Sequence, residues 1–364
     1  MAFTTINDPS AQFQTTLYTG DDATDRALTN TGNSNLQPDW VWIKCRNDTY
    51  DHVVVDSSRG ASTTTTGTQI SSNLTTGQPS NTNGHVKSFN TDGFNVRSGS
   101  SGGNPLVGVN KSAKTYVAWQ WKANGGTTAS NGNGSITSTV QANTTAGFSI
   151  VKWTGTGSAA TIGHGLGVTP QFIIVKNLDK SSQWAVYHHK VGATKYVALN
   201  DDDAVATYSG YWNDTSPTTS VFSVGSDGDV SGGNGEEVIS YCFAPIKGYS
   251  KFGAYTGNGN ANGPFVYTGF KPAWVMIKEL TATGSWHMFD TKRNVDNVSN
   301  NVLYADLGNA ESTNNTGNPI DILSNGFKCR GTGNDTNNDG NDYIYMTFAQ
   351  IPLVATNNVV ATAR

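Results

Sequence analysis

The string PDWVWIK at residues 38–44 recurs as PQFIIVK at 170–176 and as PAWVMIK at 272–278. Four other kinds of segment surround each copy in the same order. They are an aromatic-Thr-Gly motif (18–20, 153–155, 255–257), an aromatic or apolar segment (52–56, 183–188, 285–290), a segment containing Phe (92–98, 220–226, 325–331) and a strongly apolar segment (116–123, 238–245, 343–350). Five landmarks in constant order predict a tandem triplication.

The landmarks have the composition of strands. WVWI, FIIV and WVMI are apolar on both faces, which is typical of a central strand buried between two layers. Asn-Gly and Asp-Gly pairs between the landmarks favour tight hairpin turns. No stretch keeps a 3.6-residue apolar period for three turns, so we expect little helix. We therefore predict an all-β fold of three tandem homologous β-sandwich (jelly-roll or concanavalin-like) domains.

The repeat also sets the expected boundaries. We predict β-sandwich repeats at 1–124, 147–247 and 248–353, and a C-terminal tail at 354–364. Residues 125–146 are rich in Gly, Ser, Thr and Asn and contain no aromatic residue, which predicts a flexible linker, although ITSTV could form a short edge strand. Only the short segment 245–248 joins the second and third repeats, so we expect them to pack as a rigid pair.

Composition excludes several classes of protein. Only 14% of the 364 residues are charged, against about 25% in an average soluble protein, and the net charge is −4. Such a chain has no basic field for nucleic acid, and no apolar run approaches the roughly 18 residues needed for membrane insertion. Residues 1–13 lack the features of a secretory signal, so we expect synthesis in the cytoplasm. The three widely spaced cysteines are expected to be buried reduced thiols.

No motif in the chain predicts catalysis or metal binding. The adjacent pair Glu236 and Glu237 has no counterpart in the other repeats and is expected to open a charged hairpin. His164, His188 and His189 are expected at turns or strand ends. Residues 335–340 fit the opening of a calcium loop, but Met346 stands where its twelfth-position acid belongs. We therefore predict no catalytic residue, no metal and no cofactor.

Two aromatic residues stand apart from the repeated strands. Tyr211 and Trp212 lie within TYSGYWNDTSP (207–217), which has no counterpart in the other repeats. We predict that they are exposed and form a ligand-binding site, with a sugar as the ligand. The other prominent tryptophans recur at strand positions and are assigned to cores: Trp40, Trp119, Trp184, Trp274 and Trp286.

The repeated motifs resemble a known group of proteins. HGLGVTPQFIIVK (164–176), FKPAWVMIK (270–278), the opening FTTINDPSAQFQTTLYTG and the ending VVATAR are similar to the tandem β-domain virion structural and tail-fibre-type proteins of marine bacteriophages, including cyanophages. SSRGA (57–61) also fits, whereas the later repeats depart from it. The resemblance implies no catalytic residues.

The resemblance implies a function and a set of partners. We expect a non-enzymatic virion structural protein, displayed on the particle as a fibre or capsid decoration. The expected partners are other virion proteins, two further copies in a homotrimer and a host surface glycan, without nucleic acid or membrane insertion. The alternatives are a carbohydrate-active polysaccharide depolymerase and a cell-surface adhesin, of which the missing signal disfavours the second.

Overall fold

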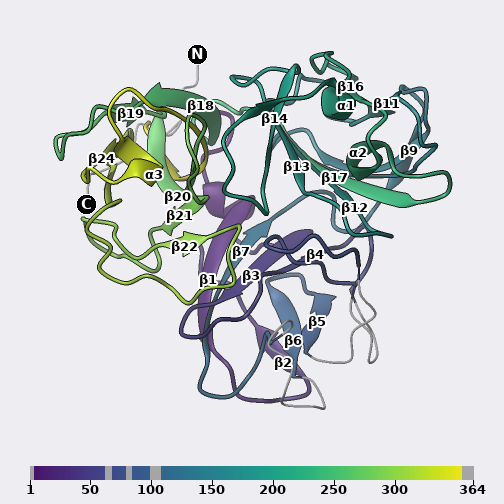
Figure 1. The fold of residues 1–364 in the computed structure, drawn as a ribbon. Helices are drawn as coiled ribbons and strands as arrows, with labels where there is room; N and C mark the ends of the chain where they lie inside the picture. The colour runs from purple at the N-terminus through teal and green to yellow at the C-terminus, as the bar shows by residue number, and fades with distance from the viewer. Residues whose placement is uncertain (1–3, 62–67, 79–83, 99–107, 355–364) are drawn as a thin grey trace.

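The computed structural model describes residues 4–61, 68–78, 84–98 and 108–354, and strands dominate it. Figure 1 shows three lobes that follow one another along the chain, coloured purple to blue, teal and green to yellow. We call them the first, second and third lobes, with residues 4–124, 125–247 and 248–354. The helices within the described ranges are single turns: η1 (Pro9–Ala11), α1 (Ser209–Trp212), α2 (Gly228–Ser231) and α3 (Asn334–Asn337). The all-β prediction is confirmed.

Each lobe contains a main antiparallel sheet in which four of the landmarks occupy the same places. The common orders are β1 (Phe13–Thr19), β7 (Thr115–Trp121), β3 (Trp40–Cys45), β4 (Val53–Asp56); then β10 (Phe148–Thr154), β17 (Glu237–Phe243), β12 (Phe172–Asn177), β13 (Ala185–His188); and β18 (Ser250–Thr256), β25 (Asp342–Pro352), β20 (Phe270–Glu279), β21 (His287–Asp290). The second main sheet continues with β14 (Lys195–Ala198) and β15 (Ala206–Thr207), and the third with β22 (Leu303–Tyr304). The strand formed by the repeated string is therefore central in every lobe.

A smaller sheet lies beside each main sheet and contains the fifth landmark. The three small sheets are β2 (Arg26–Leu28), β6 (Phe94–Arg97), β5 (His85–Phe89); β11 (Ala160–Gly163), β16 (Val221–Val224); and β19 (Phe265–Tyr267), β24 (Gly326–Cys329), β23 (Ile320–Leu323). In the first lobe Ile43 from the main sheet and Phe94 from the small sheet belong to the same buried cluster. Each lobe thus has its own core between two sheets.

The prediction of a flexible linker at residues 125–146 is wrong. This segment forms β8 (Ala129–Asn131), which is an edge strand of the second main sheet, and β9 (Ser138–Asn143), which pairs with β8 and β10. The alternative of a strand at ITSTV is confirmed in part, because β9 includes its last three residues. Ser138 and Val140 of β9 are buried on one face, and Gln141 is buried on the other face, where it contacts the first lobe. The Gly-rich part at 132–134 is a hairpin turn. Of the predicted tail at 354–364, residues 355–364 lie outside the described residues.

A fourth core lies where the three lobes meet. It contains Trp40 from the first lobe, Phe172 from the second and Trp274 from the third, which are equivalent residues of the repeated string. Because side chains alternate along a strand, Trp40 and Trp42 face this common core while Val41 and Ile43 face the core of their own lobe. This explains why the repeated string is apolar on both faces. All three lobes share the core, so the second and third do not form a separate pair.

Polar contacts close the three lobes into a ring. His52, Trp184 and Trp286 occupy equivalent positions just before β4, β13 and β21, and each contacts a backbone carbonyl of another lobe. His52 Nε2 lies 2.8 Å from Tyr304 O, Trp184 Nε1 lies 3.0 Å from Ser71 O, and Trp286 Nε1 lies 2.8 Å from Ala198 O. The first lobe thus contacts the third, the second contacts the first, and the third contacts the second.

A second set of equivalent residues joins the lobes at the ends of the same strands. Tyr241 of the second lobe donates to Asp56 of the first at 2.8 Å, and Trp119 of the first donates to Asp290 of the third at 3.1 Å. Both aspartates are buried and paired with an arginine three residues on, Arg59 or Arg293. A buried carboxylate needs such partners.

The joint between the second and third lobes is built differently. His188 stands at the position of the two aspartates, and Val191 stands at that of the arginines. Met346 stands at the position of Tyr241 and Trp119 in the last strand of its lobe. Its side chain has no hydrogen to donate. At this joint, other residues therefore replace both the Asp–Arg ion pair and the side chain that donates a hydrogen bond to the aspartate.

Candidate functional site

The structure places Tyr211 and Trp212 inside the second lobe. Both belong to the helical turn α1, which turns their rings inward, and they are only 3% and 1% exposed. The ring of Trp212 packs edge-on against Tyr187 at 5.7 Å between centroids. The prediction that these two residues are exposed is wrong, because a stretch read as an open loop packs into the core of its lobe. They cannot offer a ring face to a sugar in this arrangement.

An exposed aromatic residue lies next to them. Tyr208 is 42% exposed, and its ring lies 5.4 Å from that of Tyr211 and 6.0 Å from that of Tyr196, which is half-buried. Tyr208 Oη donates to Asp227 Oδ2 at 2.8 Å, and Asp227 accepts the N–H of Asp229 at the start of α2. We call Tyr196, Tyr208 and Asp227 the tyrosine patch. An exposed ring beside a carboxylate is suited to a ligand that is apolar on one face and rich in hydroxyls.

The Glu236 and Glu237 carboxylates have partners of their own. Glu236 Oε2 accepts from Asn177 Nδ2 at 2.7 Å and from the Gly233 N–H at 2.6 Å. The Asn177 hydrogen bond, with that of Gly233 and the charge of Lys180, lowers the pKa of Glu236. Glu237 pairs with Lys152 at 3.1 Å. A general acid of glycoside cleavage needs a raised pKa, so the shift at Glu236 is in the wrong direction.

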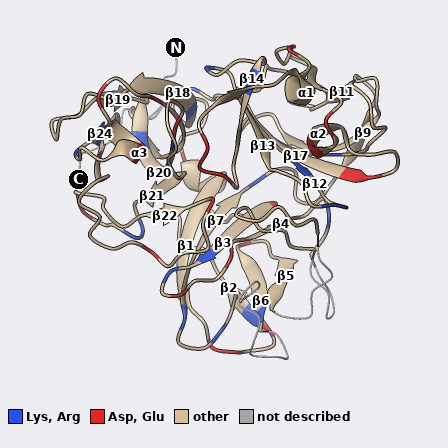
Figure 2. Cartoon of the chain, viewed as in Figure 1, with Lys and Arg blue, Asp and Glu red and all other residues tan. Residues whose placement is uncertain are grey.

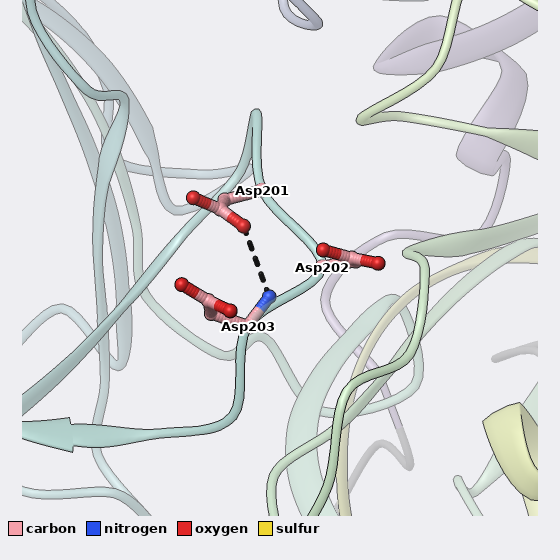
Figure 3. Close-up of side chains that lie close together, drawn as sticks. All are labelled: Asp201, Asp202 and Asp203. Carbon is pink, nitrogen blue, oxygen red and sulfur yellow. Dashed lines mark hydrogen bonds between the residues drawn. The ribbon is translucent and has the colours of Figure 1, made fainter.

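Three successive aspartates form a cluster on a turn of the second lobe. The carboxylates of Asp201, Asp202 and Asp203 each have an oxygen within 4.8 Å of the others, and Asp201 accepts the N–H of Asp203 at 3.1 Å (Figure 3). Asp202 and Asp203 are exposed. The backbone carbonyls of Asp202 and Asp203 accept hydrogen bonds from Lys278 Nζ of the third lobe, at 3.0 and 2.8 Å. The turn thus has a structural function at the joint between the two lobes.

The lysine of the repeated string is buried in every lobe. Lys44, Lys176 and Lys278 are fully buried, and each donates to backbone carbonyls. Burial lowers the pKa of Lys176 to about 7 and that of Lys44 to about 8. Lys176 Nζ reaches Thr75 O of the first lobe at 2.7 Å, just as Lys278 reaches the second lobe. Lys176 and Lys278 thus bind loops of neighbouring lobes, whereas Lys44 donates to Cys45 O and Asp48 O of its own lobe. The sequence pattern did not reveal these contacts.

His164, His188 and His189 also have structural roles. His164 is buried, and its Nε2 lies 3.2 Å from Thr218 O. His189 Nε2 lies 2.9 Å from Phe252 O of the third lobe, so this residue belongs to a joint. His188 Nδ1 accepts the N–H of Lys190 at 3.1 Å. Burial lowers the pKa of all three.

Charge is sparse over the whole molecule. Most of the ribbon in Figure 2 is tan, and the blue and red segments are scattered over the three lobes. No helix in the described part of the chain is long and apolar enough to cross a membrane. Together, the fold and these contacts define an all-β protein whose repeats close around one core and whose buried polar residues join the repeats.

The chain belongs to the family described as a domain of unknown function (DUF7483), whose model matches residues 8–352. One family model therefore spans the three repeats and the strands between the first two. The searches of the curated proteins and of the solved structures found no match.

Proposed function

We propose that this chain is a non-enzymatic structural protein of a bacteriophage particle, displayed on its surface as a fibre or capsid decoration. We further propose that its lobes are three tandem β-sandwich domains of the jelly-roll or concanavalin-like kind. The observation that supports a structural function is the use of equivalent polar residues as joints between lobes. The resemblance of the repeated strings to virion proteins supports the location.

The state of the buried polar groups argues against catalysis at these positions. Lys44, Lys176 and Lys278 are buried and donate to backbone carbonyls, and Asp56 and Asp290 are neutralised by adjacent arginines. A catalytic acid, base or nucleophile must reach its substrate. Groups bound in this way instead hold the lobes of the chain together.

The partners in this proposal are other virion proteins, two further copies in a homotrimer and a host surface glycan. The tyrosine patch is the place for the glycan, since Tyr208 is exposed and Asp227 offers a hydrogen-bond acceptor. Light scattering tests self-association, because a trimer has three times the 38.6 kDa of one chain.

Quantitative mass spectrometry of purified virions tests the location. We expect the chain in the particle, at a copy number near that of the capsid protein for a decoration and at few copies for a fibre. Its absence from purified particles would reject the proposal.

Incubation with host polysaccharide tests the assignment as a non-enzyme. We expect no new reducing ends from the wild-type chain. Cleavage that is lost in an E236Q/E237Q double variant would instead identify a polysaccharide depolymerase, and purification of the chain from a bacterial cell surface would identify an adhesin.

A further inference from the structure

The outer edge of β1 in the first lobe has no neighbouring strand among the described residues, because β1 pairs only with β7. The Lys122 N–H donates to Gln12 O, so every second residue from Gln12 onward carries the hydrogen bonds to β7. The backbone N–H and C=O groups of Thr15 and Leu17 therefore point outward from the sheet. Such an edge is a template for a further strand.

The equivalent edge in the second lobe is covered. There β10 pairs with β9 as well as with β17. Ile150 stands at the position of Thr15 and lies opposite Gln141 of β9. Lys152, which stands at the position of Leu17, also pairs with β9. The second lobe thus shows what fits this edge, namely a strand that runs antiparallel to it.

The covering segment also fills the space between the two sheets of the second lobe. Ile136 forms a bridge with Ile162 of β11, and Ser138 Oγ donates to Gly163 O of the same strand at 2.7 Å. Residues 135–143 thus lie between the edge of the main sheet and β11. In the first lobe β2 stands at the position of β11, and no described strand lies between β1 and β2.

A groove remains in the first lobe where this strand is missing. Two adjoining cavities of about 390 and 330 Å³ follow the outer edge of β1, and both are lined by Thr15, Thr31 and Lys292. The larger cavity continues past Leu17 to β2, and the smaller one reaches Ala273 of the third lobe. We call these two cavities the β1 groove. An open groove along an unpaired strand suits β-strand addition, in which an extended peptide joins the edge of a sheet.

Lys292 of the third lobe stands where the second lobe receives a contact from its covering strand. The residue at the same position after β4 is Ser58, and Gln141 of β9 donates to Ser58 Oγ at 2.9 Å. A strand in the β1 groove would therefore present its residue at the Gln141 position to Lys292. Because Lys292 is a cation, an acidic residue is favoured at that position.

The other charged groups that line the β1 groove have partners. Arg26 pairs with Asp21 at 3.4 Å, and Asp8 accepts a hydrogen bond from Ser34 Oγ at 2.6 Å. Lys292 is exposed, and no carboxylate in the described part of the chain pairs with it. The charge available to a bound strand is therefore positive.

The third lobe closes the equivalent place with its own side chains. Phe252 stands at the position of Thr15, and its carbonyl oxygen lies 2.9 Å from His189 Nε2 of the second lobe. Lys251 Nζ donates to Tyr267 O and so links β18 to β19. We therefore expect strand addition at the first lobe and not at the third.

We propose that the β1 groove binds an extended strand of another protein chain, which runs antiparallel to β1 and places an acidic residue beside Lys292. The strand has the chemistry of β9, with small polar and β-branched residues and no other charge. Since residues 135–143 of this chain are already paired with β10, another chain must supply it. The outward backbone groups of Thr15 and Leu17 bind its backbone, and Lys292 selects the acidic residue.

The test uses the full chain and a fluorescent synthetic peptide of residues 134–143 that carries Gln141→Glu. Fluorescence anisotropy should show one peptide bound per chain. Lys292→Ser, which introduces the residue found at Ser58, should weaken binding of this peptide about 3-fold, as expected for an exposed ion pair. Binding of the unmodified peptide, with Gln141, should not change. Neither result depends on whether the chain belongs to a virion.

Leu17→Pro tests the edge itself. Proline has no N–H, and an edge strand accepts it where that N–H faces solvent, so the variant should fold. We expect peptide binding to fall more than about 10-fold, because a hydrogen bond is lost and its carbonyl partner stays unpaired. Ala254→Pro is the matched control, since Ala254 holds the equivalent position in β18, and it should bind like the wild type. Circular dichroism checks that both variants are folded.

Four results would overturn the proposal. They are a folded wild-type chain that binds neither peptide, equal binding by the wild type and Leu17→Pro, equal affinity for the Glu and Gln peptides, and amide hydrogen exchange in which the bound peptide protects β18 instead of Thr15 and Leu17. Protection of Thr15 and Leu17 is the expected result, because their N–H groups gain partners.

Discussion

Trp184 shows how a single side chain joins two lobes. Its ring packs in the common core, while its Nε1 donates to Ser71 O and Leu74 O of the first lobe at 3.0 and 3.1 Å. Those carbonyls belong to a loop, and Ser71 O also accepts the Leu74 N–H at 3.2 Å. A buried carbonyl without a donor costs about 1–3 kcal/mol, so the indole N–H matters separately from the ring.

Substitution of Trp184 by Phe tests this contribution. Trp153→Phe is the matched control, since Trp153 is also buried and its Nε1 has no hydrogen-bond partner in the described structure. Both changes remove similar ring volume, but only Trp184→Phe removes hydrogen bonds. We expect it to lower the free energy of unfolding by about 1–3 kcal/mol more than the control, as measured by urea unfolding. Equal losses would show that the N–H contributes nothing.

The elements owe their arrangement to small residues at the repeated motifs. The glycine of each aromatic-Thr-Gly motif lies against the backbone that precedes the last strand of its lobe. A Cβ at Gly20, Gly155 or Gly257 would lie 2.1 Å from Lys111 O, 2.5 Å from Ser231 O or 2.1 Å from Asn338 O, respectively. The motif is therefore required for close approach of two segments within every lobe.

A Gly257→Ala substitution should push the loop after α3 away from β18. We expect it to lower the free energy of unfolding by about 1–3 kcal/mol, because the added methyl group has no space. Gly132→Ala serves as the control, since nothing lies within 4 Å of a Cβ there. Urea unfolding of the two variants measures the difference, and a Gly257→Ala variant as stable as Gly132→Ala would contradict the steric explanation.

The whole molecule is held by one core that all three lobes share. Large aromatic residues meet across each joint: Trp40 lies 4.6 Å from Tyr241, Trp121 lies 5.7 Å from Trp274, and Phe172 lies 6.0 Å from Phe252, measured between ring centroids. Loss of one lobe would expose the faces that the other two bury against it. The lobes should therefore unfold together.

Differential scanning calorimetry tests this cooperativity. We expect one transition in which the calorimetric and van't Hoff enthalpies agree, rather than a separate transition for each lobe. Independent lobes would instead give a van't Hoff enthalpy well below the calorimetric one.

The buried histidines make the molecule sensitive to acid. Burial lowers the pKa of all six, to about 3 for His52 and His188. Below about pH 6.5 the unfolded chain binds protons that the folded chain does not, so stability falls as the pH falls. Asp306, whose pKa burial raises to about 6, offsets part of this loss because its folded form holds a proton more tightly.

The buried lysines also make stability increase with pH, but over a higher pH range. Lys176 and Lys44 release protons near pH 7 and 8 in the folded chain, while the unfolded chain keeps them to about pH 10. Stability should therefore rise from acid to mildly alkaline pH, as measured by urea midpoints. His188→Asn, which keeps an acceptor for the Lys190 N–H, should lose less stability on acidification. A pH dependence identical to that of the wild type would contradict this.

The strands of each lobe could be predicted because the residue pattern that indicates a strand lies within the strand itself. PDWVWIK and its two relatives are apolar on both faces and bounded by turn residues, and they form β3, β12 and β20. The flexible linker predicted at residues 125–146 was wrong because the prediction relied on composition. Ser and Thr are common in linkers, but they also occur in paired strands such as β9. The error at Tyr211 and Trp212 came from the helical turn α1, which is too short to leave a periodic pattern.

The amino-acid sequence by itself determined the all-β class, the threefold repetition and the strand at each landmark, because alternation and turn residues are local properties. Only the tertiary structure decided that the lobes close around a common core and that Lys176 binds a loop 101 residues earlier in the chain. These contacts join residues far apart in the chain, and no local pattern encodes which lobe a buried donor will meet.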